Sequence, residues 1–252
     1  MTQPAPPAAG GVPPPVPPAL PPVLVVSGTG TEVGKTVTTA AIAALAAGHG
    51  RRVTVVKPAQ TGEPPGPTGD LQVIRRLSGV TATRELARFA DPLSPEAAAR
   101  AAGQPPLDLA AAAVLVKELA LDADLVLVEG AGGLLVRYDP AGGTIADLAA
   151  MLGAPVLVVT TAGLGTLNHT ALTLEALHTR QLATAGVVIG SWPAEPGLAE
   201  RANRTDLPAI AGGPLAGALP AGAARLSRAG FLAAARAGLS PAFGGAFRDQ
   251  AN

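Results

Sequence analysis

Two kinds of apolar segment alternate along the chain. Short continuous runs rich in Val and Leu, such as 23–28 and 125–128, are typical of strands buried on both faces, whereas longer Ala- and Leu-rich runs, such as 35–50, are typical of helices. The pattern also predicts a strand over 51–58, stopped by a proline, and a helix over 70–79. Further helix-then-strand segments are 107–133, 145–163, 166–190 and 206–220. This alternation predicts an α/β fold with a doubly wound, mainly parallel sheet covered by helices on both faces.

The two ends of the chain differ from this pattern. Ten of the first 22 residues are proline and none is charged, a composition that cannot bury enough surface to fold alone. The segment also lacks the basic start and uninterrupted apolar middle of a secretory signal. We therefore expect a disordered tail over 1–22, a single domain over 23–240 and a flexible C-terminal tail over 241–252.

The composition excludes several functions. Lys and Arg together number 18, Asp and Glu also number 18, and at most two basic residues are adjacent, which argues against binding to nucleic acid or a membrane surface. No apolar run approaches the ~18 residues of a membrane span, and the lack of cysteine excludes disulfides, zinc–thiolate sites and thiol catalysis. A cytoplasmic enzyme is the expected class. Only three lysines occur, Lys35, Lys57 and Lys117, and two of them lie in motifs described below.

The segment SGTGTEVGKT, residues 27–36, lies between an expected strand and an expected helix. It is similar to a phosphate-binding loop, Gly, four residues and Gly-Lys-Ser/Thr, except that Gly28 stands one position early and Thr29 takes its place. Free backbone N–H groups at the helix start favour an oxyanion, Lys35 can reach the terminal phosphates and the Thr36 hydroxyl can bind Mg²⁺. An ordinary strand-to-helix turn is the alternative, but strand, glycines, Gly-Lys-Thr and helix together indicate a P-loop NTPase-type fold.

Charged residues stand at strand ends, which a parallel sheet brings to one edge. Lys57 closes the second expected strand in KPAQTG, and Glu129 follows the buried run 125–128 in VEGAGG. Two ammonium groups, Lys57 and Lys35, suit transfer of a γ-phosphoryl group, although a solvated strand-end lysine is the ordinary alternative. A carboxylate at the end of a buried strand needs a cation or hydrogen bonds, which favours Glu129 as an Mg²⁺ ligand. Asp70 is either a second ligand or the N-cap of the following helix.

A second glycine-rich turn lies within GLGTLNHTALTLEAL, over 163–177, and also connects a strand to a helix. The first helical turn, 166–169, suits an anion such as a carboxylate, and Asn168 can donate a hydrogen bond there. His169 is a candidate base, but a lone His near a helix start is more often a structural hydrogen-bond donor. We therefore assign His169 no catalytic role.

Together these motifs resemble the dethiobiotin synthetase family. The resemblance extends from residue 23 to 222 and rests on GTGTEVGKT, KPAQTG, VEGAGG, GLGTLNHTALTLEAL and PLAGALP in the family's order. A phosphate loop with five residues between its glycines is a feature of that family, which explains the early Gly28.

The resemblance implies an activity in biotin biosynthesis. CO2 joins 7,8-diaminononanoate as a carbamate, ATP phosphorylates the carbamate to a carbamic-phosphoric anhydride, and ring closure gives dethiobiotin, nucleoside diphosphate and phosphate. Mg²⁺ is the implied cofactor. The implied assembly is a homodimer in which the substrate carboxylate is held across the interface.

The resemblance also implies roles for individual residues. Those at the reacting groups are Lys35, Lys57, Thr31 and Glu32. The implied nucleotide site comprises Gly30, Thr31, Glu32, Val33, Gly34, Lys35, Thr36, Val37, Asp70, Glu129, Gly130, Ala131, Gly132, Gly190, Ser191, Pro220, Ala221 and Gly222. The implied substrate site comprises Thr31, Lys57, Thr61, Gly132, Gly133, Leu164, Gly165 and Asn168. The implied metal ligands are Thr36, Asp70 and Glu129.

Two positions depart from the family's usual sequence. Family members commonly have Asn-Asp after the sixth strand, where the Asn side chain reads adenine, and here Gly190 and Ser191 stand in those places. Base recognition then rests on backbone groups, Ser191 and the loop 220–222, so we expect a relaxed or altered preference, with CTP or another triphosphate accepted beside ATP. The other departure is Glu96 in SPEAAA, where the family often has His; nothing in the sequence explains it mechanistically.

Other classes of protein share parts of this pattern. ParA/MinD-type switch ATPases carry a signature lysine four residues before the Gly of Gly-Lys-Thr, where Gly30 stands here, and the sequence offers no basic surface or amphipathic helix for their partners. Amidoligases that act on corrinoid precursors have a related nucleotide half. They also carry a glutaminase domain with a cysteine nucleophile, and this chain has no cysteine. A non-catalytic relic is disfavoured because Lys35, Lys57 and Glu129 are all present.

Overall fold

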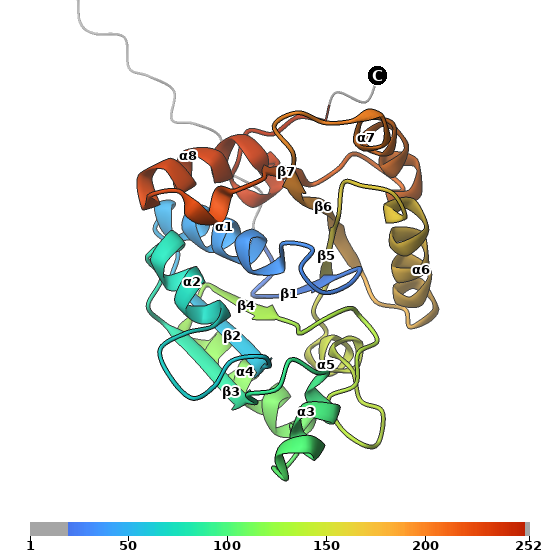
Figure 1. Cartoon of the computed structure of the whole chain (residues 1–252). Coiled ribbons are helices and arrows are strands. Elements are labelled where there is room, and N and C mark those ends of the chain that lie inside the picture. Colours follow the sequence, from blue (N-terminus) through green and yellow to red (C-terminus); the bar gives the residue numbers. More distant parts are fainter. Residues whose placement is uncertain (1–19, 250–252) are drawn as a thin grey trace, which may run out of the picture.

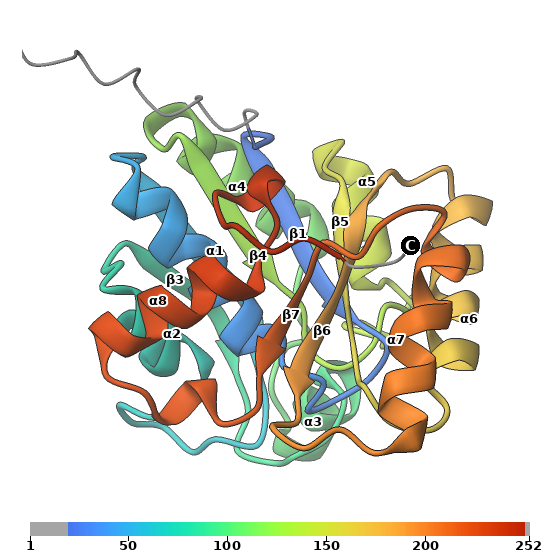
Figure 2. The same ribbon diagram turned by 90° about the horizontal axis from the view of Figure 1, so that it is seen from above.

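One seven-stranded sheet lies between two layers of helices in the computed structural model, which describes residues 20–249 (Figures 1 and 2). Neighbouring strands all pair in parallel, in the order β3-β2-β4-β1-β5-β6-β7. The strands are β1 (Val23–Gly28), β2 (Val53–Gln60), β3 (Thr83–Arg88), β4 (Leu125–Glu129), β5 (Val156–Thr160), β6 (Thr184–Trp192) and β7 (Gly217–Pro220). The predicted doubly wound α/β fold is confirmed. The part of the expected N-terminal tail before residue 20 lies outside the described residues.

Helices cover the two faces of the sheet separately. On one face α1 (Lys35–Gly48), α2 (Asp70–Ser78) and α8 (Arg228–Gly238) pack together over one apolar core. The helices that contribute to the opposite core are α3 (Pro95–Ala102), α4 (Leu109–Asp122), α5 (Ile145–Leu152), α6 (Thr166–Thr179) and α7 (Leu198–Ala211). Two short 3₁₀ turns, Ala223–Arg225 and Pro241–Phe243, follow β7 and α8.

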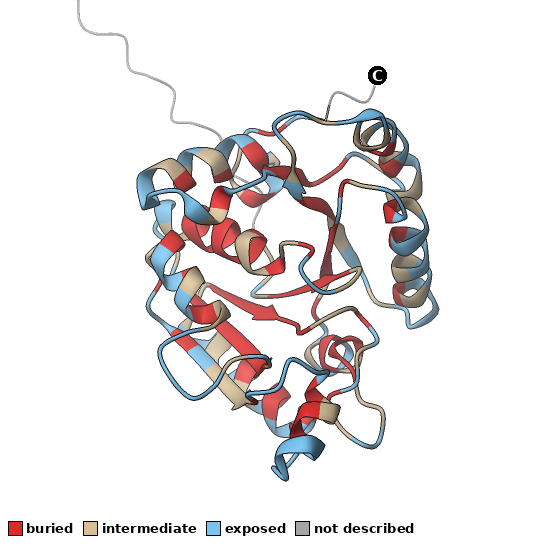
Figure 3. Cartoon of the chain, viewed as in Figure 1, coloured by how far each residue is buried: buried red, intermediate tan, exposed pale blue. Residues whose placement is uncertain are grey.

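The strands at the centre of the sheet are buried on both faces (Figure 3). Every residue of β4 and β5 is buried, as the continuous apolar runs predict for parallel strands between helical layers. β1 lies between these two strands, so its carboxyl end, Gly28, opens where ligands of such sheets bind.

Some elements differ from the sequence prediction. β2 does not stop at Pro58 but continues to Gln60; its pairing with β4 reaches only Val56 and Val128, so Pro58 falls where β2 pairs with β3 alone. The pattern misses β3, an edge strand with several charged residues, as well as α3 and α8. α7 begins at Leu198, before the predicted segment 206–220. The sequence pattern misses its first turns because they are mostly polar and show no apolar stripe.

The segment after α8, expected to be a flexible tail over 241–252, packs on the domain as far as it is described. Phe243 and Phe247 are buried, and the Leu215 N–H donates to Asp249 Oδ2 at 2.9 Å. The packed structure therefore extends past the predicted boundary at residue 240. Within residues 20–249, none of the helices has the length and apolar character needed to cross a bilayer.

Candidate active site

The phosphate loop, Gly28 to Gly34, joins β1 to α1 and packs against β6. Gly34 has a φ of 98°, and a Cβ at this position would come within 2.6 Å of the Gly190 carbonyl oxygen. A Cβ at Gly190 would in turn clash with the Val33 carbonyl oxygen. Both positions therefore need glycine for the loop to approach the strand. Gly34 is also the N-cap of α1 and has no side chain to cap it, which leaves the first N–H groups of the helix to a ligand.

Lys35 folds back over this loop. Its Nζ donates to the Gly30 carbonyl oxygen at 2.8 Å, and the residue is buried. Burial and the charge of Lys57 lower the pKa of Lys35 from 10.5 to about 8, although Glu129 and Asp70 act in the opposite direction. An oxyanion in the loop would restore the charged form, as phosphate binding requires.

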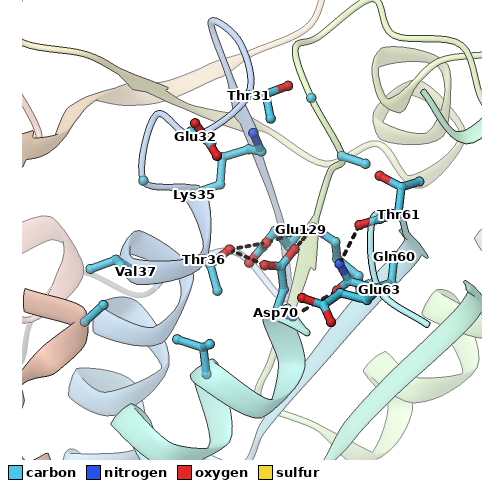
Figure 4. Close-up of a pocket in the computed structure, with 16 residues that line it drawn as sticks. Thr31, Glu32, Lys35, Thr36, Val37, Gln60, Thr61, Glu63, Asp70 and Glu129 are labelled. Atoms are coloured by element: carbon cyan, nitrogen blue, oxygen red, sulfur yellow. Dashed lines mark hydrogen bonds and ion pairs between the residues drawn. The ribbon is translucent and has the colours of Figure 1, made fainter. Parts of the chain in front are cut away.

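Next to the loop, Asp70, Glu129 and Thr36 lie close together (Figure 4), and with Lys57 they form a polar and charged cluster. Lys57 Nζ lies 2.9 Å from Glu129 Oε1 and 2.5 Å from Asp70 Oδ2, and donates to the Gly130 carbonyl oxygen at 3.1 Å. Thr36 Oγ1 lies 3.0 Å from Asp70 Oδ1 and 2.9 Å from Glu129 Oε1. The four side chains come from β2, α2, β4 and α1, so segments distant in the sequence meet at one edge of the sheet.

The ion pairs favour the charged forms of Lys57 and Asp70. Burial alone would lower the pKa of Lys57, but Glu129 and Asp70 outweigh it and raise that pKa above its ordinary value. Burial likewise opposes ionisation of Asp70, but Lys57 and then the Thr36 hydroxyl lower the pKa of its carboxyl. Because Lys57 is 3% exposed and paired, the alternative of a solvated strand-end lysine is wrong.

The oxygen donors of the cluster fit Mg²⁺. Glu129 Oε2 is buried and has no hydrogen-bond partner in the described part of the chain, an arrangement that is costly unless a cation or water is bound there. Thr36 and Asp70 add further oxygens, and Mg²⁺ takes its remaining ligands from phosphate and water. No group of three or more His, Cys, Asp or Glu residues suited to a metal occurs among residues 20–249. Asp70 is the first residue of α2 and Gly69 is the N-cap, so the N-cap alternative for Asp70 is wrong.

These groups line a pocket of about 460 Å³ (Figure 4). Predicted site residues that line it are Thr31, Glu32, Gly34, Lys35, Thr36, Val37, Lys57, Thr61, Asp70, Glu129, Ala131 and Gly132. Four further lining residues were not predicted from the sequence: Gln60, Glu63, Val73 and Ala224. Gln60 Oε1 accepts the Asp70 N–H at 2.9 Å and its Nε2 donates to the Thr61 carbonyl oxygen at 3.1 Å, so it fixes the start of α2 at the pocket. The sequence signal that could have pointed to Gln60 is its place in the KPAQTG motif.

The glycine-rich loop after β4 packs beside the phosphate loop. A Cβ at Gly133 would be 3.5 Å from the Gly28 carbonyl oxygen, which shows how closely the two loops approach. The buried Tyr138 hydroxyl accepts the Ala131 N–H at 2.7 Å and holds this loop in place, a role that no sequence motif indicated. Val33, predicted in the nucleotide site, has its side chain in the core with Val26 and Val159, so only its backbone can face a ligand.

Two predicted binding segments lie outside the pocket. The Ala221 N–H donates to the Trp192 carbonyl oxygen at 2.7 Å, which brings 190–192 and 220–222 together at the ends of β6 and β7. Leu164, in the turn before α6, and Asn168, in the first turn of α6, are exposed to solvent. Ser191 and residues 220–222 are also exposed, whereas Gly190 is buried, and neither segment lines the pocket. Glu96 does not line it either and instead pairs with Arg100 at 2.7 Å.

Comparison with solved structures shows the same fold. A ParA-family ATPase from Chlorobium tepidum is 14% identical, with a TM-score of 0.51 over 87% of this chain and 90% of that chain. The MinD cell division protein from Aquifex aeolicus is also 14% identical, with a TM-score of 0.51 over 79% and 81% of the two chains. The shared architecture and the phosphate loop define an α/β fold of the P-loop NTPase type.

Sequence comparison assigns the family. Residues 23–224 match a family described as an AAA domain. An ATP-dependent dethiobiotin synthetase of Parafrankia is 63% identical over 225 residues, 89% of this chain and 94% of the relative. That of Streptomyces avermitilis is 58% identical over 223 residues, 88% and 94% of the two chains. The chain therefore belongs to the ATP-dependent dethiobiotin synthetase family.

Proposed function

We propose that the protein is a nucleoside-triphosphate- and Mg²⁺-dependent ligase that forms dethiobiotin from 7,8-diaminononanoate and CO2 in the cytoplasm. The observation that carries this proposal is the convergence of two lysines, two carboxylates and the Thr36 hydroxyl on one pocket beside the phosphate loop. Family membership indicates the reaction, and the pocket contains the charged groups that the reaction needs.

The chemistry divides into three steps. One amine attacks CO2 and loses a proton, which leaves a carbamate. A carbamate oxygen attacks the γ-phosphorus, the bond to the β-phosphate oxygen breaks and nucleoside diphosphate leaves, giving a carbamic-phosphoric anhydride. The second amine attacks the anhydride carbonyl, phosphate leaves with the bonding electrons, and the amine loses a proton as the ring closes. Since both amines belong to one molecule, closure is intramolecular and benefits from a high effective concentration.

The two lysines supply the positive charge for phosphoryl transfer. Lys57 is held by Glu129 and Asp70, so its ammonium group is fixed in orientation opposite the carbamate. Lys35 lies over the loop, and we propose that its ammonium group contacts the γ-phosphate of a bound nucleotide. Together they neutralise charge on the transferred group, which is the main catalytic contribution in this class of reaction. Thr36, Asp70 and Glu129 would hold Mg²⁺, which when bound withdraws charge from the phosphate oxygens.

The diamine occupies the side of the pocket near Lys57. Thr31, Glu32 and Thr61 line the pocket and offer polar groups to the amines, while Gly132, which also lines it, leaves room for them. In support of a homodimer, the turn proposed to receive the carboxylate, Leu164, Gly165 and Asn168, does not line the pocket of its own chain. Leu164 is 88% exposed, which leaves this turn open to the substrate of a second copy.

The base of the nucleotide is proposed to lie near Ser191 and the loop 220–222. Gly190 is packed against Gly34 and has no side chain to read the base. Backbone groups and one hydroxyl discriminate weakly, so we propose that CTP or another triphosphate is accepted beside ATP. Km values for the four triphosphates test this, and strict selectivity for ATP would contradict it.

The function is tested by phosphate release from purified protein with Mg²⁺, bicarbonate, 7,8-diaminononanoate and each of ATP, CTP, GTP and UTP. We expect release that requires the diamine, with dethiobiotin identified by mass. Lys57→Met should abolish the product, whereas Lys117→Met, which changes an exposed lysine of α4, should not. Thermal denaturation checks that both variants fold. Release indifferent to the diamine, or no dethiobiotin with any triphosphate, would overturn the proposal.

A further inference from the structure

A cluster of buried threonine hydroxyls joins the phosphate loop to the start of α6. Thr160, the last residue of β5, is fully buried, as are Thr166 and Thr170 of α6. Thr160 Oγ1 lies 2.7 Å from Thr166 Oγ1, 2.8 Å from Thr170 Oγ1 and 3.4 Å from Thr29 Oγ1. Nothing in the proposed reaction uses these four hydroxyls directly.

The direction of each hydrogen bond follows from the number of protons available. The Thr166 hydroxyl donates to the Thr161 carbonyl oxygen at 2.7 Å, so its only proton is used and it can only accept from Thr160. Thr160 therefore donates to Thr166 and accepts from Thr170 and Thr29. Because its one proton and both lone pairs are engaged, Thr160 is the centre of the cluster, and an apolar residue of the same shape cannot replace it.

The segments joined by Thr160 belong to two different binding sites. Thr29 begins the phosphate loop, and its N–H donates to the Val159 carbonyl oxygen at 2.9 Å. Thr166 is the first residue of α6, directly after the exposed turn at Leu164. On the far side of that turn, the buried Asn203 amide donates to the carbonyl oxygens of residues 162 and 163 at 2.9 and 2.8 Å. The turn is thus held at two buried anchors, one of which also contacts the phosphate loop.

We propose that Thr160 is a positioning residue that couples the nucleotide site to the turn before α6. Its hydroxyl fixes the two segments relative to each other, so a nucleotide that orders the loop also orders the turn that receives the substrate carboxylate, and the effect is reciprocal. The inference rests on the proposed function. In the proposed homodimer this turn serves the substrate of a second copy, so the coupling runs from one active site to the other.

Calorimetric titration of the full-length chain measures the coupling as a ratio of dissociation constants. A non-hydrolysable ATP analogue with Mg²⁺ is titrated with and without saturating 7,8-diaminononanoate. In the wild type we expect the diamine to tighten analogue binding about five- to tenfold, at the lower end of typical coupling. Thr160→Val keeps the shape of the side chain but removes its hydroxyl. Thr29→Val removes only the hydrogen bond between the phosphate loop and Thr160. Both variants should bring the ratio below about twofold. Thr160→Ser retains the hydroxyl and should keep the wild-type ratio.

Two controls separate coupling from stability. Thr170→Val removes a buried hydrogen bond but leaves Thr160 connected to both segments, so it should lower the Tm and keep the ratio. Thr173→Val removes a hydroxyl that donates to the His169 carbonyl oxygen at 2.8 Å near the surface of the same helix, and should change neither quantity. Thr29 is only half-buried, so Thr29→Val decides the question where Thr160→Val fails to fold.

A wild-type ratio near one, or an unchanged ratio in both Thr160→Val and Thr29→Val, overturns the inference. Wild-type protein that forms no dethiobiotin overturns the proposed function and this inference with it. Dethiobiotin formation with a ratio near one overturns the inference alone.

Discussion

The buried charge of Lys35 should make the nucleotide-free protein less stable than its Lys35→Met variant at neutral pH. The side chain is buried, and burial with the nearby charge of Lys57 lowers its pKa from 10.5 to about 8. That difference of about 2.5 pH units corresponds to ~3.5 kcal/mol against the folded state, at about 1.4 kcal/mol per unit. Losing the hydrogen bond to Gly30 offsets about 1 kcal/mol. We expect the variant to gain about 2.5 kcal/mol in free energy of unfolding at pH 7.

The sign of the pH dependence follows from proton counts. Between pH 8 and 10.5 the folded lysine is largely neutral while the unfolded one remains protonated, so the unfolded state binds more protons. The wild type therefore gains stability from this group as pH rises, by about 1.4 kcal/mol per pH unit. The destabilisation is fully present below pH 8 and absent above 10.5, so the advantage of Lys35→Met shrinks across this window and reverses at its upper end.

Urea unfolding of the two nucleotide-free proteins at pH 7, 8, 9 and 10 measures this difference, because the contributions of other titrating groups cancel. Lys117→Met, at an exposed position of α4, is the matched control and should change the free energy of unfolding by less than about 0.5 kcal/mol at each pH. A Lys35→Met protein less stable than wild type at pH 7, or an advantage that is the same at all four pH values, would refute the reasoning.

Substitutions at three other positions probe the loops around the pocket. Tyr138→Phe leaves the buried Ala131 N–H without its acceptor and should lower the free energy of unfolding in urea by about 1–3 kcal/mol. Gly190→Ala places a methyl group against the Val33 carbonyl oxygen and should weaken ATP binding at least about tenfold by calorimetry, since the loop must move or strain. Glu129→Gln removes the charge of a proposed Mg²⁺ ligand and should raise the Mg²⁺ concentration for half-maximal phosphate release at least about tenfold.

Each of these variants has a result that would contradict its prediction. A Tyr138→Phe protein as stable as wild type would show that the hydroxyl is dispensable to the loop. Gly213→Ala is the control for Gly190→Ala, because a Cβ at Gly213 meets no neighbouring atom within 4 Å, and equal ATP affinities in the two variants would remove the steric argument. Glu118→Gln, at an exposed position of α4, is the control for Glu129→Gln, and an equal Mg²⁺ requirement in both would exclude Glu129 as a ligand.

The sequence predicts best those parts of the fold that are buried on both faces. β1, β4 and β5 read as continuous apolar runs because helices cover both sides of the sheet there. β3 shows no such run because, as an edge strand, it is only partly covered and contains charged residues. Pro58 wrongly indicates the end of β2 for a different reason. Whether a proline ends a strand depends on whether a neighbouring strand needs its backbone N–H, and beyond Val56 β2 pairs with β3 alone.

The pocket could be predicted to the extent that its chemistry is local. The motif over 27–36 contributes Lys35 and Thr36, which begin α1. The ends of parallel strands meet at one edge of the sheet, which brings Lys57 and Glu129 beside them. Thr160 could not be found in this way, because it acts on segments far apart in the sequence and only the fold places Thr29 and Thr170 around it.

The close packing of Gly34 against Gly190 constrains how a base-reading side chain could be built at the proposed nucleotide site. A side chain at 190 needs the space that the phosphate loop now fills, so a residue that reads the base there must be accompanied by a loop drawn back from β6. Evolution cannot adjust the two positions one at a time without passing through a poorly packed intermediate. Transplanting base selectivity from a relative therefore requires exchanging the loop and the strand end as one unit.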